Sequence, residues 1–103
     1  MRVIEVLSDK IEEEVCDARD YIRLALEYKE DYPELSRTLY NLSNQEMEHM
    51  NMLHGEVSEI IKKYKDEHGD PPSDMMAVYD YLHKKQIDKA KEVKTMQTMY
   101  KEQ

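Results

Sequence analysis

The stretch SNQEMEHMNMLHGEV, residues 43–57, holds a glutamate and a histidine three positions apart, Glu46 and His49. Side chains at i and i+3 of a helix lie on one face, one turn apart, so both can hold a single ion. Carboxylate and imidazole donors together suit iron, manganese or zinc. The pair therefore predicts metal binding, whereas the competing interpretation is a chance Glu-x-x-His on an exposed helix face.

The apolar residues around this pair favour a ligand role. At about 100° per residue, Glu46 falls in the middle of a helical apolar stripe and His49 on its shoulder. Glu14 falls on the apolar stripe of the preceding helix, whereas Glu13 points away from it. An ionised carboxylate in an apolar interior is costly unless it is paired or binds a metal. We therefore predict Glu14, Glu46 and His49 as metal ligands. The stripe around Glu46 consists of Leu35, Leu39, Leu42, Leu53, Val57, Ile60 and Tyr64.

Three helices are expected to position these residues. Charged residues make up 37% of the chain, glycine and proline are few, and the apolar residues recur at helical spacing, which predicts the all-α class. Pro33 separates two helices that form a long antiparallel hairpin over residues 1–68. Residues 69–74 form a Pro-rich linker, and residues 75–103 a third helix, in the same domain or at an oligomer contact. Its stripe is interrupted by Gln86 and Gln97, and we expect residues 94–103 to fray.

This ligand set is half of a known arrangement. Di-iron carboxylate bundles take one Glu from each of two helices and a Glu-x-x-His from each of the other two. A two-fold dimer that completes a four-helix bundle would bring together two copies of Glu14, Glu46 and His49, giving four carboxylates and two imidazoles. The rival arrangement is a monomeric three-helix bundle that binds one ion at most, or in which a protonated His49 pairs with the carboxylates.

Two segments resemble a known family. SNQEMEH, residues 43–49, looks like the iron-ligand motif of the rubrerythrin branch of the ferritin-like superfamily, and ARDY, residues 18–21, is similar to the segment that follows its first ligand glutamate. The resemblance covers the first two helices and implies a ferritin-like hairpin with Glu14, Glu46 and His49 as ligands to iron or manganese. The family spacing before the Ala-Arg pair is one residue shorter, which leaves Glu13 and Asp17 as alternatives to Glu14.

The same resemblance suggests an oligomer and a reaction. The chain resembles the encapsulated ferritins in length, and these build a ferroxidase site between two subunits. This resemblance implies a homodimer or higher oligomer with a di-iron site at the interface. The rubredoxin-like cysteine module of full rubrerythrins is lacking, so the resemblance does not extend to their peroxidase chemistry.

Charge and composition narrow the classes of partner. The net charge of −8 argues against a nucleic-acid groove or an anionic membrane surface, both of which need clustered Lys and Arg. Cys16 is the single cysteine, so neither an intrachain disulfide nor a zinc finger can form. The first residues lack the apolar core of a signal peptide, and no later stretch approaches membrane-spanning length. We therefore expect a soluble, cytoplasmic protein without nucleic-acid or membrane partners.

Other polar residues have weaker patterns. Asp80 and His83 repeat the carboxylate-x-x-His spacing but flank their stripe, so we expect them to be solvated. His54 and Glu56 lie at the edge of the second helix.

Two functional hypotheses follow. The first is a ferritin-like iron protein with ferroxidase activity. The second is a metal-free helical assembly or adaptor protein in which the predicted ligands form a buried polar network that fixes register and partner choice.

Overall fold

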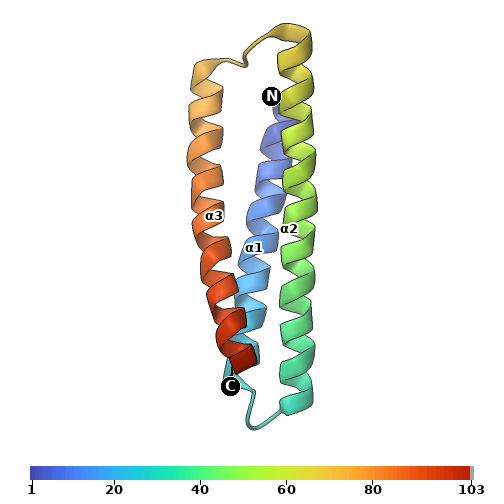
Figure 1. The fold of residues 1–103 in the computed structure, drawn as a ribbon, viewed down its shortest axis with the longest axis vertical. Helices are drawn as coiled ribbons and strands as arrows, with labels where there is room; N and C mark the ends of the chain where they lie inside the picture. Colours follow the sequence, from blue (N-terminus) through green and yellow to red (C-terminus); the bar gives the residue numbers. More distant parts are fainter. Residues whose placement is uncertain (103) are drawn as a thin grey trace.

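The structure is a computed structural model that describes residues 1–102, and it contains three helices. They are α1 (Arg2–Glu27), α2 (Pro33–His68) and α3 (Ser73–Glu102). The helices run side by side, each antiparallel to the one before it in the chain, and give a rod of 55 × 19 × 18 Å (Figure 1). The described residues include no strand. The predicted all-α class and the hairpin of two long helices are therefore confirmed.

The helix boundaries follow from a few residues. Pro33 opens α2 at its first turn, where the missing N–H costs no hydrogen bond. Gly69 ends α2 with a φ of 79°, a conformation that favours glycine, and two prolines follow it. The Asp74 side chain accepts a hydrogen bond from the Met75 N–H at the start of α3. The break between α2 and α3 is shorter than expected, because Ser73 and Asp74 already belong to the helix.

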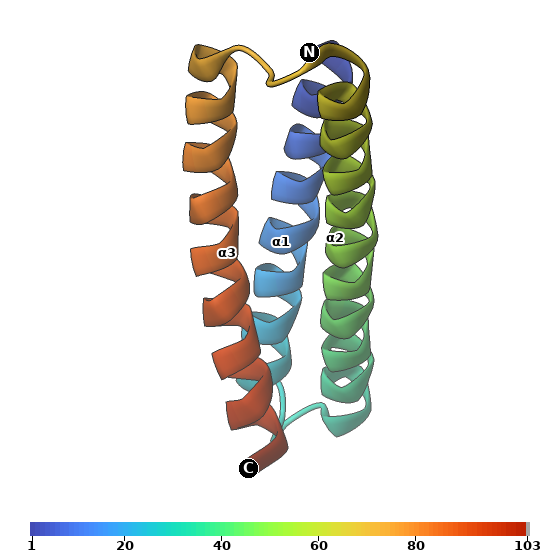
Figure 2. The same ribbon diagram turned by 45° about the horizontal axis from the view of Figure 1, so that its top comes forward.

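Helix α1 is the centre of the fold. It buries one residue in almost every turn, and both other helices pack on it, whereas the backbones of α2 and α3 scarcely approach each other (Figure 2). The core of the molecule is therefore a narrow column along α1. Its buried residues on that helix are Ile4, Ser8, Ile11, Val15, Ala18, Ile22 and Ala25.

Small residues contribute to the contact between α1 and α2, together with the buried Met47 and Val57. Ser36 and Ser43 are fully buried, and their hydroxyls donate hydrogen bonds to the backbone carbonyls of Ala25 and Ala18. Of the stripe expected to form the core, Val57 alone is buried, while Leu35 remains 46% exposed. Serine and alanine let the two backbones approach closely at these positions, because their side chains are small. Apart from Val57, the stripe therefore borders the core, and Leu39, Leu53 and Ile60 pack against its buried clusters.

Helix α3 is held by polar contacts as well as by packing. The two glutamines that interrupt its apolar stripe point inward: Gln86 is buried and donates to the Ser8 carbonyl oxygen at 3.1 Å, and Gln97 donates to the Ser43 hydroxyl at 3.0 Å. Near its end, the Tyr100 ring stacks on Tyr40 with centroids 4.5 Å apart. The expected fraying is not observed over residues 94–102, which are helical.

Candidate metal centre

The structure brings Glu14 of α1 together with Glu46 and His49 of α2. Each residue offers one ligand atom, and these three atoms all lie within 4.8 Å of one another. His49 Nδ1 is 3.5 Å from Glu14 Oε2 and 3.8 Å from Glu46 Oε1. Over residues 1–102 this is the one such group of three His, Cys, Asp or Glu side chains. All three residues selected from the sequence are therefore members of a single cluster.

The register between α1 and α2 explains why Glu14 lies close to Glu46 and His49. The Ser43 hydroxyl bonds to the Ala18 carbonyl, which pairs these two positions across the antiparallel contact. Because the two helices are antiparallel, a residue one turn after Ser43 on α2 lies opposite a residue one turn before Ala18 on α1. Glu46 therefore lies across from Glu14, and the neighbouring residues Val15 and Met47 belong to the buried core cluster.

The burial of the cluster is graded. The side chains of Glu46 and Glu14 are only 18% and 22% exposed, whereas that of His49 is 53% exposed. Glu14 Oε2 is shielded from solvent and has no hydrogen-bond partner. A shielded carboxylate oxygen without a donor is unfavourable, and a bound cation would satisfy it. The carboxylates are thus held inside, and the imidazole lies at an open edge.

The two alternatives to Glu14 lie outside the cluster. Glu13 is 62% exposed and pairs with Lys10 at 3.2 Å on the same helix. Asp17 is exposed to solvent. On α1, therefore, Glu14 alone of these three carboxylates lies beside Glu46 and His49.

The residues around the cluster form a continuous face, here called the ligand face. It consists of Leu7, Glu14 and Tyr21 on α1 and Leu42, Glu46, His49 and Leu53 on α2, which recur at helical spacing. None of its apolar members is fully buried in the single chain. The predicted ligands are thus surrounded by apolar side chains that are only partly covered.

A second histidine-containing group was not anticipated from the sequence. His54 of α2 and His83 of α3 stack with ring centroids 4.4 Å apart, and the Tyr79 ring also stacks with His83, at 5.6 Å. Burial, and then the neighbouring His54, lowers the pKa of His83. Asp80 is exposed, as expected, but His83 is half-buried. No local pattern indicates this pair, because it depends on how α2 and α3 face each other.

Comparison of the chain with family models, with curated proteins and with solved structures found no match. The likeness to rubrerythrin-type proteins therefore rests on the two short segments alone. Among the helices of residues 1–102, none is both long enough and apolar enough to span a bilayer.

Proposed function

We propose that the chain is a ferritin-like metal-binding protein that holds iron, or alternatively manganese or zinc, through Glu14, Glu46 and His49. Two copies of the chain meet at the ligand face, so that each contributes one such set. In the proposed dimer, the two sets form a carboxylate-rich site of four glutamates and two histidines, which is the donor set of di-iron carboxylate bundles.

The observation that carries this proposal is the 4.8 Å cluster of two carboxylates and one imidazole from two helices. Its donor types match metals that accept mixed oxygen and nitrogen ligands. The unpartnered, shielded oxygen of Glu14 supports the fit, because a cation would replace its missing hydrogen-bond donor.

The dimer is supported by the incompleteness of the site and by the ligand face. One chain supplies three donors, which leaves coordination positions open on the exposed side of His49. Half-buried Leu42 and Leu53 flank the cluster on α2. Covering these side chains with a second copy would stabilise the dimer by about 25 cal/mol for each Å² of apolar surface removed from water.

The proposed activity is the oxidation of Fe(II) by dioxygen. Iron in a carboxylate-rich site supplies this redox chemistry when it is bound. The chain's own contribution is to hold two glutamates in a partly shielded position, and to leave the His49 edge open to entering ions.

The first experiment measures metal content by mass spectrometry after anaerobic Fe(II) loading, together with the molar mass in solution. About two irons per dimer are expected. Glu46→Ala should lose this iron. Glu48→Ala is the matched control, because Glu48 is an exposed carboxylate two residues away on the same helix. Equal iron in both variants would refute the site.

The metal-free assembly function remains the second candidate. His49 Nδ1 lies between the two carboxylates, at 3.5 and 3.8 Å, so a protonated imidazole could pair with both. In that case Glu46→Leu should keep or raise the free energy of unfolding while broadening the distribution of oligomers. Under the metal proposal, Glu46→Leu loses iron instead.

A further inference from the structure

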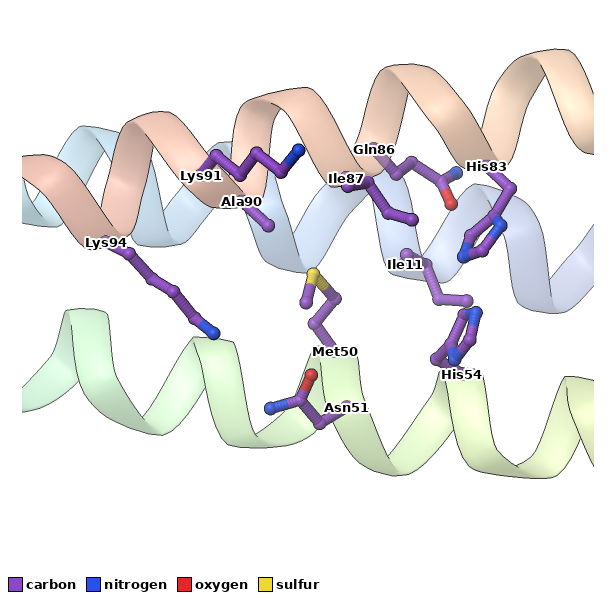
Figure 3. A pocket seen from close by; sticks show the side chains of 10 residues that line it. All are labelled: Ile11, Met50, Asn51, His54, His83, Gln86, Ile87, Ala90, Lys91 and Lys94. Carbon is purple, nitrogen blue, oxygen red and sulfur yellow. The ribbon is translucent and has the colours of Figure 1, made fainter.

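The stacked histidines His54 and His83 bring two nitrogen donors together from different helices, outside the Glu14, Glu46 and His49 cluster. Their ring planes differ by 18°, and in Figure 3 the two imidazoles reach toward each other from α2 and α3. The backbones of these two helices scarcely approach each other. The connection at this level of the bundle therefore depends on the two side chains.

One nitrogen of the pair has no partner. Nε2 of His54 is shielded from solvent, and no group within residues 1–102 forms a hydrogen bond with it. A shielded polar atom without a partner is unfavourable. Glu14 Oε2 in the first cluster has the same property. A metal ion that accepts the lone pair of the nitrogen would remove this cost.

The second ring of the pair is suited to donate a lone pair. Burial, and then the neighbouring His54, lowers the pKa of His83, so its imidazole is neutral at neutral pH. Neutral imidazole is the form that binds metal ions, because the proton and the metal compete for the same lone pair.

The separation of the rings is compatible with a shared ion. Each nitrogen ligand of zinc lies about 2.0–2.1 Å from the metal, so two such nitrogens are at most about 4 Å apart. The ring centroids of His54 and His83 are already 4.4 Å apart. The rings are face to face, and they must turn about their Cβ–Cγ bonds to aim one nitrogen each at a common point. This torsion has broad energy minima in histidine, so the rotation is inexpensive.

Open space beside the rings leaves room for an ion with its water ligands. Both histidines line a cavity of about 430 Å³ on α2 and α3, and both also line a second cavity of about 340 Å³. A water molecule takes up about 30 Å³, so either cavity can accommodate several. Two protein ligands and water together can complete the coordination of a divalent ion.

The donor type and the nearby charges select the metal. Imidazole suits zinc, copper and nickel, whereas calcium and magnesium require oxygen ligands. Lys62 and Lys65 line the larger cavity together with Asp66, so charge alone does not attract a cation there. Asp80 lies one turn before His83 and is the carboxylate whose charge acts on that ring. Affinity must therefore come mainly from metal–nitrogen bonds, which favours the late ions of the first transition row over Fe(II) and Mn(II).

From these features we infer that His54 and His83 together bind a zinc, copper or nickel ion that bridges α2 and α3, with water in the remaining coordination positions. The ion connects α3 to the helical hairpin where the backbones scarcely meet, and so stabilises the three-helix arrangement. The donors are nitrogens from α2 and α3, whereas the first cluster has mainly carboxylates from α1 and α2. The inference therefore does not depend on iron binding.

The test titrates Zn(II) into the full chain carrying Glu46→Ala, which removes a ligand of the first cluster. NMR spectra follow the ring resonances of the four histidines. Those of His54 and His83 should shift together and saturate at about one zinc per chain, at lower zinc concentrations than those of His49 and His68. Mg(II) at the same concentrations should shift neither ring of the pair.

Matched substitutions in the Glu46→Ala chain identify the ligands. His54→Phe and His83→Phe each keep an aromatic ring and should weaken zinc binding by at least about tenfold, which is 1.4 kcal/mol of binding free energy. His68→Gln, at an exposed histidine of α2, should bind zinc as tightly as the parent. Competition with a chromophoric chelator measures the affinities, and circular dichroism verifies that each variant is helical. In the chain with Glu46 intact, His54→Phe should leave iron content unchanged, so this site and the first cluster can fail separately.

A copper spectrum tests the site without relying on the phenylalanine variants. Electron paramagnetic resonance of the Glu46→Ala chain with one equivalent of Cu(II) should show splitting from two imidazole nitrogens. The inference is overturned if zinc shifts His49 or His68 before the pair, or if the phenylalanine variants bind zinc as tightly as His68→Gln. A copper spectrum with fewer than two nitrogen ligands would also overturn it.

Discussion

At the scale of single residues, the choice of Glu14 over Glu13 is a matter of about 100° of rotation around α1. Glu14 reaches His49, whereas Glu13 pairs with Lys10 in solvent. We predict that Glu14→Ala lowers iron content to that of Glu46→Ala, and that Glu13→Ala retains it. Metal analysis after Fe(II) loading checks this. Retention of iron in Glu14→Ala together with its loss in Glu13→Ala would move the ligand to Glu13.

Ser43 allows a test of how side-chain size and hydrogen bonding at the α1–α2 contact affect the free energy of unfolding. Its fully buried hydroxyl donates to Ala18 at 2.7 Å and accepts from Gln97 at 3.0 Å. Ser43→Ala should cost about 1 kcal/mol of unfolding free energy through the lost hydrogen bonds. Ser43→Leu should cost more, about 1–3 kcal/mol, because the close helix contact has no room for it. Urea unfolding measures both, and Ser58→Ala, at an exposed serine on α2, should be neutral.

At the scale of elements, α3 depends on specific side chains because its apolar stripe is narrow. The Lys89 ammonium pairs with Glu12 of α1, and this hydrogen bond lowers the pKa of the Glu12 carboxyl. The stabilisation from Glu12 is therefore present above its unfolded pKa of about 4.5 and is lost as the pH falls below that value.

His83 makes the attachment of α3 sensitive to mild acid. Burial, and then the neighbouring His54, lowers its pKa from the usual 6.5. The unfolded chain therefore takes up a proton more readily than the folded one, and the free energy of unfolding should fall as the pH drops through about 6.5. We predict lower stability at pH 5.5 than at pH 7.5, measured by urea unfolding.

The control for this pH effect is a variant that keeps an aromatic ring at position 83 but has no titratable group there. His83→Phe retains an aromatic ring that can stack with Tyr79 and His54, so the difference in stability between the two pH values should shrink. His68→Gln, at an exposed histidine near the end of α2, should leave it unchanged. A His83→Phe protein with the full pH dependence would contradict the assignment to His83.

At the scale of the whole molecule, the ligand face should control assembly and metal binding together. Leu42→Lys places a charge among the half-buried residues beside Glu46 and should convert the proposed dimer into a monomer with a helical circular dichroism spectrum. Iron binding should fall with the dimer, because in the proposed dimer each chain supplies half of the ligands. Sedimentation velocity and metal analysis measure the two effects. Val78→Lys, at a 60% exposed residue of α3, is the control and should change neither.

Helical periodicity alone determined much of this protein. The period of 3.6 residues, with breaks at Pro33 and at Gly69–Pro72, is a local property, and it predicted three helices and their antiparallel hairpin. The same period predicted that Glu14, Glu46 and His49 share one region, and the structure brings them together.

Tertiary structure alone decided which helix faces touch. Periodicity reports that leucines recur on one side of α2, but close packing against α1 selected Ser36 and Ser43, because backbones approach nearest where side chains are small. The packing of the three helices also explains why Gln86 points inward and donates to the Ser8 carbonyl, and why His54 stacks on His83. These contacts join residues far apart in sequence, and their partners depend on the arrangement of all three helices.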